Sequence, residues 1–279
     1  MNVGRGSDSN RVFSSQIAGR ACPRRTAKDK QMNVLFVGAH PDDIETYSGG
    51  TAALYAKMGA NVFFCVATSG NIGSSTHTME EIKAIRRKEA EAGAAVIGAK
   101  LIMLDFDDEF LFDTRETRLA FIEAFRIADP DVVFCHWTHD YNPDHSTSSQ
   151  IVDDCVHMAS IPLIKTKTPP TKKQIPLVYY MDTPAGVGFE PMLYVDITST
   201  FDTKVDMVSK HESQNQWMID IYGTDMSGFL KVPASFRGFQ AGCKYAEAFR
   251  PSVRWGRTFL EHPLPQFRQV SGVWTCERQ

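Results

Sequence analysis

The feature that most constrains the fold is a regular alternation of short apolar runs with longer segments of helical spacing, which begins at Asn33. The apolar runs are rich in Val, Phe and Ile, which is typical of buried strands. Strands are expected at 33–39, 62–68, 101–106, 131–136, 177–181 and 193–197. Helices are expected at 49–58, 79–97, 117–128 and 146–159, the last with Ser146 as its N-cap. This order predicts an α/β fold with a mainly parallel sheet and right-handed crossovers.

The two ends of the chain differ from this pattern. Residues 1–31 contain seven basic and two acidic residues and show no periodicity, so we expect a disordered basic leader or extension. After Thr198 the pattern is mainly helical, with helices expected near 204–222 and 234–248. No linker divides the remainder, which predicts a single domain over 32–279.

Composition excludes several classes of protein. The net charge of −3 gives no reason to expect nucleic acid as a partner. No apolar run reaches the length of about 18 residues that a membrane-spanning helix needs. The six cysteines are scattered without a C-x-x-C pair, which favours a reducing compartment and a cytoplasmic location.

The first motif that carries chemistry is His40-Pro41-Asp42-Asp43, directly after the first strand. Ligands of an open α/β sheet bind at the carboxyl ends of its strands. Imidazole and carboxylate suit Zn²⁺, and a second carboxylate beside a ligand can act as a base. The alternative is a simple turn, since Pro and Asp are turn residues.

The second motif is the segment 136–145, His-Trp-Thr-His-Asp-Tyr-Asn-Pro-Asp-His, which follows the fourth strand. Two strand ends that offer histidines at the same edge of a parallel sheet can converge. A His/Asp/His set leaves one coordination position open, as catalytic zinc sites do.

These two motifs, Ala39-His40-Pro41-Asp42-Asp43-Ile44-Glu45 and Pro143-Asp144-His145, resemble the LmbE-like or PIG-L-like zinc deacetylases. That family removes acetyl groups from N-acetylglucosamine-type amines. The resemblance implies a Rossmann-like fold with Zn²⁺ as cofactor, and Asp144 as a carboxylate that orients an imidazole. It implies His40, Asp43 and His145 as zinc ligands and Asp42 as the general base. It extends more weakly to 211–214, where His211 is expected to be structural.

The resemblance also implies two residues that bind substrate. Arg86 matches the arginine of an Arg-x-x-Glu helix near the substrate, and the alternative is a solvated helix face. Asp108 matches a carboxylate that grips sugar hydroxyls, and the alternative is an exposed acidic loop. The chain departs from the family pattern at Glu109, where glycine is frequent, and at Asn71, where an acidic residue is common.

A third departure concerns catalysis. Asn142 stands where the family commonly has a histidine that helps to hold the oxyanion and to transfer a proton. Asn142 can donate a hydrogen bond to an oxyanion but cannot carry a proton. Three interpretations follow: His139 takes over the role, Asp42 moves the proton alone, or the activity is low or altered.

Together these observations predict a zinc-dependent hydrolase that removes an acetyl group from a small-molecule N-acetylated amino sugar or its glycoside. The alternatives are an amidase acting on a non-sugar amide and a weakly active or non-catalytic sugar-binding relative. A nucleotide-binding protein is disfavoured, because no G-x-G-x-x-G follows the first strand. The sequence leaves open whether the chain forms a homo-oligomer.

Overall fold

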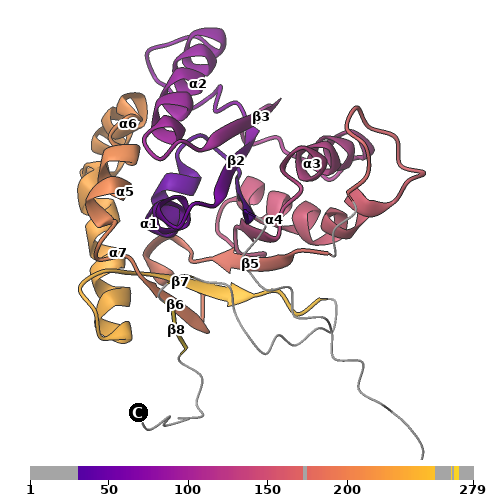
Figure 1. Ribbon diagram of the computed structural model, residues 1–279. Coiled ribbons are helices and arrows are strands. Elements are labelled where there is room, and N and C mark those ends of the chain that lie inside the picture. Colours follow the sequence, from indigo (N-terminus) through magenta and orange to yellow (C-terminus); the bar gives the residue numbers. More distant parts are fainter. Residues whose placement is uncertain (1–30, 172–174, 255–264, 266, 270–279) are drawn as a thin grey trace, which may run out of the picture. The chain divides into compact units, whose positions relative to one another are not determined.

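The alternating segments form one twisted sheet with helices on both faces (Figure 1). The computed structural model describes residues 31–171, 175–254, 265 and 267–269, so the predicted leader lies outside the described residues. The sheet has eight strands in the order β3-β2-β1-β4-β5-β7-β6-β8. The strands are β1 (Asn33–Gly38), β2 (Asn61–Thr68), β3 (Lys100–Phe106), β4 (Val132–Cys135), β5 (Leu177–Met181), β6 (Leu193–Asp196), β7 (Ala246–Pro251) and β8 (Phe267–Gln269).

The five strands from β3 to β5 are parallel, which confirms the predicted mainly parallel α/β sheet. The chain proceeds outward from β1 through β2 to β3, then returns to place β4 on the other side of β1. The order of strands therefore reverses between β1 and β4. In open α/β sheets, such a switch point is where ligands bind.

The helices are α1 (Asp43–Lys57), α2 (Met79–Ala95), α3 (Arg115–Ala128), α4 (Pro143–Cys155), α5 (Phe201–Val208), α6 (Glu212–Tyr222) and α7 (Met226–Ala241). One face of the sheet packs against α1 and α5, and the other packs against α3 and α4. Figure 1 shows α5, α6 and α7 stacked beside α1 and α2, away from α3 and α4. Among the described residues, no helix has the length and apolarity needed to cross a membrane.

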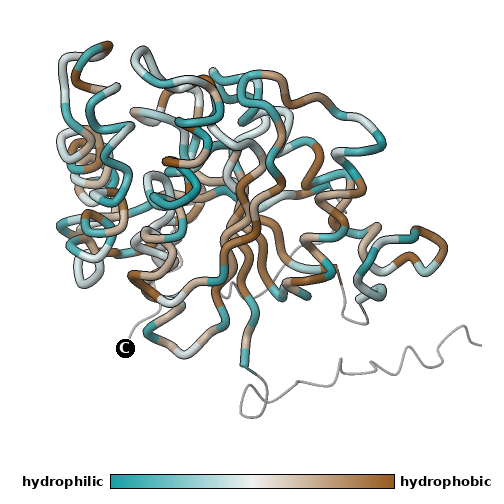
Figure 2. The backbone as a smooth tube through the Cα atoms, turned by 90° about the horizontal axis from the view of Figure 1, so that it is seen from above, coloured by the Kyte–Doolittle hydropathy of each residue, from teal (hydrophilic) through white to brown (hydrophobic). Residues whose placement is uncertain are grey.

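The central strand β1 explains why the sheet is two-sided. Val34 and Phe36 contribute to the core on the α1 face, whereas Leu35 and Val37 contribute to the core on the α3 face. All four side chains are fully buried. A strand buried on both faces needs an unbroken apolar run, and Figure 2 shows the hydrophobic strands in the middle of the molecule.

Several predicted helices differ from the structure. The helix expected at 49–58 begins at Asp43, because Gly49 and Gly50 lie inside it rather than at its start. The region 204–222 forms two helices, interrupted before Glu212.

The helix expected at 234–248 is also wrong in its second half. It ends at Gly242, whose φ of +71° suits a left-handed cap, and the chain then enters β7. The predicted mainly helical C-terminal part therefore also supplies β7 and β8, which extend the sheet in antiparallel pairing.

Candidate metal centre

The predicted ligands meet at the carboxyl ends of β1 and β4. His40 lies two residues after β1, and His136 follows β4 directly. Asp42 is the N-cap of α1 with a φ of 110°, and this sharp turn brings Asp43 back so that its Oδ2 accepts a hydrogen bond from the His40 amide at 2.6 Å. The segment is thus both a turn and a source of clustered ligands.

Helix α4 brings His145 to the same place. Its N-cap is Asn142, whose Oδ1 accepts hydrogen bonds from the amides of Asp144 (2.8 Å) and His145 (3.3 Å). The predicted N-cap, Ser146, is therefore wrong: Pro143 opens the helix, where proline costs no hydrogen bond. Ser146 instead donates its hydroxyl to the carbonyl of Asp140.

Three side chains have atoms with the spacing of a tetrahedral metal site. Nδ1 of His40 lies 3.2 Å from Nε2 of His145 and 3.4 Å from Oδ2 of Asp43. Nε2 of His145 lies 3.3 Å from Oδ1 of Asp43. Ligands of a tetrahedral Zn²⁺ with ordinary bond lengths stand about 3.3–3.6 Å apart. The two Asp43 distances end at different oxygens of its carboxylate. Each of the three residues offers one ligand atom within 4.8 Å of the others, so together they can hold a metal ion.

The second nitrogen of each of these imidazoles faces a carboxylate. Nδ1 of His145 lies 3.2 Å from Oδ1 of Asp140. Nε2 of His40 lies 2.9 Å from Oδ1 of Asp108 and 3.4 Å from Oδ2 of Asp144. Metal-binding histidines commonly have such a partner, which fixes the ring orientation. The expectation that Asp144 orients an imidazole stays a prediction, and its contact with His40 supports it.

The cluster attracts positive charge. Burial opposes ionisation of Asp43, but the imidazoles of His145, His136 and His40 outweigh it and hold the pKa of Asp43 well below its usual range. Burial also opposes protonation of His145, yet Asp43 and Asp140 overcome it and raise the pKa of His145 to about 9. Nitrogen atoms that hold a proton this strongly lie in a negative potential that suits a metal cation.

Asp42 lies beside the three candidate ligands and is more accessible. Its side chain is 16% exposed, compared with 7% for Asp43. Burial raises the pKa of Asp42 to about 6, although the nearby Arg86 opposes this rise. A carboxylate with a pKa close to neutral is suited to accept and release a proton.

Arg86 and Asp108 are part of the centre's supporting structure. Arg86 is buried, donates to the carbonyl of Pro41 at 2.6 Å, and lies 3.5 Å from Asp42 and 3.7 Å from Asp108. Asp108 is buried as well. Arg86 therefore does not lie on a solvated helix face, and Asp108 does not lie in an exposed position of its loop. Substrate binding by these two residues stays a prediction.

Sequence reasoning gave no role to His136 or Asp140, although both belong to the second motif. Nε2 of His136 lies 3.0 Å from Oδ2 of Asp43, and its ring stacks on that of His145 with centroids 3.8 Å apart. By contrast, His139 is exposed and packs against Trp137. The contacts of the His139 ring are with Thr138 and Trp137 rather than with the candidate ligands, which weakens the interpretation that it replaces a histidine at position 142.

Two departures from the family pattern contact each other. Nδ2 of Asn142 donates to Oε1 of Glu109 at 2.9 Å. The third departure, Asn71, lies in the loop after β2 and contacts the loop after β3. Its side chain donates to Asp107 and accepts from the amide of Asp108. The Asn142 amide is thus occupied by its cap and by Glu109, and its contribution to an oxyanion hole stays a prediction.

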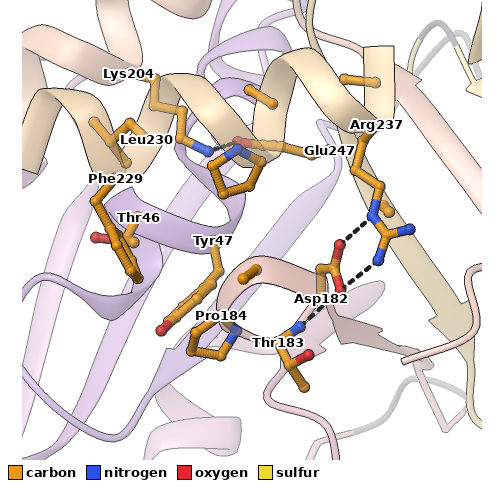
Figure 3. Close-up of a pocket in the computed structure, with 15 residues that line it drawn as sticks. Thr46, Tyr47, Asp182, Thr183, Pro184, Lys204, Phe229, Leu230, Arg237 and Glu247 are labelled. Atoms are coloured by element: carbon orange, nitrogen blue, oxygen red, sulfur yellow. Dashed lines mark hydrogen bonds and ion pairs between the residues drawn. The ribbon is translucent and has the colours of Figure 1, made fainter. Parts of the chain in front are cut away.

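Tyr47 lines a pocket (Figure 3) and also contacts the imidazoles of the centre. The Tyr47 ring lies edge-on to His136 and His145, at centroid distances of 5.6 and 6.0 Å. The charged groups that line the pocket are paired with each other, Arg237 with Asp182 and Lys204 with Glu247. Figure 3 also shows Phe229, Leu230 and Pro184 lining it.

Comparison with known proteins agrees with this architecture. The family model described as PIG-L, GlcNAc-PI de-N-acetylase, matches residues 35–156. Diacetylchitobiose deacetylase from Thermococcus kodakarensis is 28% identical over 229 residues, 78% of this chain and 82% of that protein. The 4-oxalmesaconate hydratase of Pseudomonas putida is 28% identical over 193 residues, 65% of this chain and 73% of that protein.

Among solved structures, N,N'-diacetylchitobiose deacetylase from Pyrococcus horikoshii superposes with a TM-score of 0.68 at 27% identity, covering 78% of this chain and 83% of that one. The fold and the histidine–carboxylate cluster at the switch point define an α/β protein with a candidate metal site. Over residues 35–156 the chain is similar to the PIG-L/LmbE-like family, and the relatives that it resembles include deacetylases and a hydratase.

Proposed function

We propose that this protein is a zinc-dependent hydrolase that removes the acetyl group from an N-acetylated amino sugar or its glycoside. The observation that carries the proposal is the tetrahedral spacing of His40 Nδ1, His145 Nε2 and the Asp43 carboxylate. Three protein ligands leave the fourth position for water or substrate, which distinguishes a catalytic site from a structural one.

In this proposal His40, Asp43 and His145 hold the zinc ion. When bound, zinc lowers the pKa of water and polarises the amide carbonyl. Asp42 accepts the proton of the attacking water and delivers it to the leaving nitrogen. Arg86 positions Asp42 through the Pro41 carbonyl and its own guanidinium. Asp108, Asp140 and Asp144 orient the imidazoles.

The hydratase relative supplies the competing function, addition of water to a carbon–carbon double bond. It is as similar in sequence as the deacetylase relative, at 28% identity. The same metal site and base would serve that reaction. The surroundings of the centre favour the deacetylase, because Arg86 is buried and already contacts Asp42 and Asp108, whereas a polycarboxylate substrate needs free cations.

The test is amine release from a panel of N-acetylated sugars by the zinc-loaded protein, with 4-oxalmesaconate as the competing substrate. We expect about one zinc per chain, and a loss of about 10²–10⁴ in rate for Asp42→Asn, the usual contribution of a general base. Asparagine tolerates the left-handed backbone at position 42. Asp206→Asn, a change in an exposed ion pair with Lys210, is the matched control and should retain full activity. Equal rates for Asp42→Asn and wild type would refute the mechanism.

A further inference from the structure

The loop after β3 holds a strained residue at the edge of the metal centre. Glu109 has a φ of 63°, in the left-handed region that residues with side chains avoid. Glycine would occupy this position without strain. A non-glycine residue kept in such a conformation at a functional site indicates that its side chain has a task.

Contacts on both sides hold Glu109 in place. Its amide donates to Oδ2 of Asp144 at 2.7 Å, and the amide of Leu111 donates to Oδ1 of the same carboxylate at 3.1 Å. Its carboxylate accepts from Asn142, which caps the helix that carries His145. These hydrogen bonds join the loop to the first turn of α4, which carries the candidate ligand His145.

The carboxylate of Glu109 keeps most of its hydrogen-bonding capacity. Glu109 is exposed, and an ionised carboxylate has about four acceptor positions, of which Asn142 uses one. In the part of the chain that the structure describes, no lysine or arginine pairs with it. Arg86, which contacts Asp42 and Asp108, is buried against these two carboxylates.

We propose that Glu109 determines substrate specificity: its carboxylate accepts hydrogen bonds from hydroxyl or ammonium groups on the sugar next to the acetamide and disfavours anionic substrates. The inference rests on the proposed function, because it names the substrate class of that site. Asn142 acts here as a positioning residue, since its amide orients the Glu109 carboxylate while its oxygen caps α4. The two departures from the family pattern thereby form one functional unit.

Sugar binding tests the inference separately from catalysis. Calorimetry is performed with zinc-loaded Asp42→Asn protein, with and without Glu109→Gln, against N-acetylglucosamine and its 6-phosphate. We expect Glu109→Gln to weaken binding of the neutral sugar about tenfold, as loss of a charge-assisted hydrogen bond does, and to narrow the preference for the neutral over the phosphorylated sugar. Unchanged affinity for both sugars, or no sugar binding at all, would overturn the inference. If the Asp42→Asn protein binds the sugars but the wild-type protein releases no amine from them, only the deacetylase function is overturned.

A second variant separates recognition from structure. Glu109→Gly removes the strain of the left-handed conformation, because glycine adopts a positive φ freely. This variant should therefore melt at the same or a higher temperature, while it binds the sugar as weakly as Glu109→Gln. Asp129→Gly is the control: Asp129 has a φ of 41° at the end of α3, away from the centre, and its replacement should leave sugar binding unchanged. If Glu109→Gly lowers the melting temperature and leaves the affinity intact, Glu109 is only structural and the proposal fails.

Discussion

At the scale of single residues, the chemistry of this protein depends on pairs of neighbours with different surroundings. Asp42 and Asp43 are adjacent, yet one has a raised and the other a lowered pKa. Asp43 faces three imidazoles, whereas Asp42 faces Arg86 and is more accessible. The sequence motif identified both carboxylates. Their division into ligand and base follows from the resemblance, and the surroundings that support it are tertiary.

Asp140 provides a residue-scale prediction. Its carboxylate orients the His145 ring from the side opposite the candidate metal position. We expect Asp140→Asn to weaken zinc affinity by about 10–100-fold, the usual effect of losing such a partner. Competition with a chelator of known affinity measures the change. Asp206→Asn should retain wild-type affinity, and an unchanged affinity for Asp140→Asn would show that the ring is held by other contacts.

At the scale of elements, glycines show why helix boundaries were misplaced. A Cβ atom on Gly50 would lie 2.7 Å from Ile197, and one on Gly49 would lie 3.1 Å from Met207. These glycines lie inside α1 because α5 and the residue that follows β6 approach it closely. Local propensity assigns glycine to helix ends, so only the packed neighbours explain a start at Asp43. Ala246 to Pro251 likewise became β7 because β5 and β6 offered unpaired edges.

The N-cap of α4 gives a prediction at this scale. We expect Asn142→Ala to lower the free energy of unfolding by about 1 kcal/mol, the typical value of an N-cap. It should also weaken zinc binding, because the first turn of α4 carries His145. Thr114→Ala, which removes the N-cap of α3, is the matched control. Denaturant unfolding should show a similar loss of unfolding free energy for both variants. Chelator competition should show a weakened zinc affinity for Asn142→Ala only. Equal zinc affinities would mean that the cap does not position His145.

At the scale of the whole molecule, buried ion pairs join segments far apart in the chain. His211, at the start of α6, lies 3.3 Å from Glu45 of α1, and both are fully buried. Burial lowers the pKa of His211, but Glu45 and Asp42 outweigh burial and the opposing Arg86, so the pKa is raised. The expectation that His211 is structural stays a prediction, and this contact supports it.

Stability should therefore depend on pH through His211. Because its folded pKa is raised, its stabilisation is complete below the unfolded value of about 6.5 and is lost as the pH rises through the higher folded pKa. Urea unfolding of wild type and His211→Gln, compared between about pH 6 and 9, should show a difference that shrinks toward high pH. The exposed His77→Gln is the control and should show no such trend. A constant difference would indicate that His211 stabilises by packing alone.

The sequence by itself determined the class of fold and predicted where the candidate metal site lies. Hydrophobic periodicity and strand–helix order depend on neighbours along the chain, and the two motifs lie directly at strand ends, so parallel pairing had to bring them together. Tertiary structure alone decided the antiparallel strands, the interior glycines, the imidazole partners and the Glu109–Asn142 contact. Apart from the contact of Asp140 with His145, these features join segments more than 30 residues apart. Close packing and the satisfaction of buried polar groups settle them, and no local pattern encodes either.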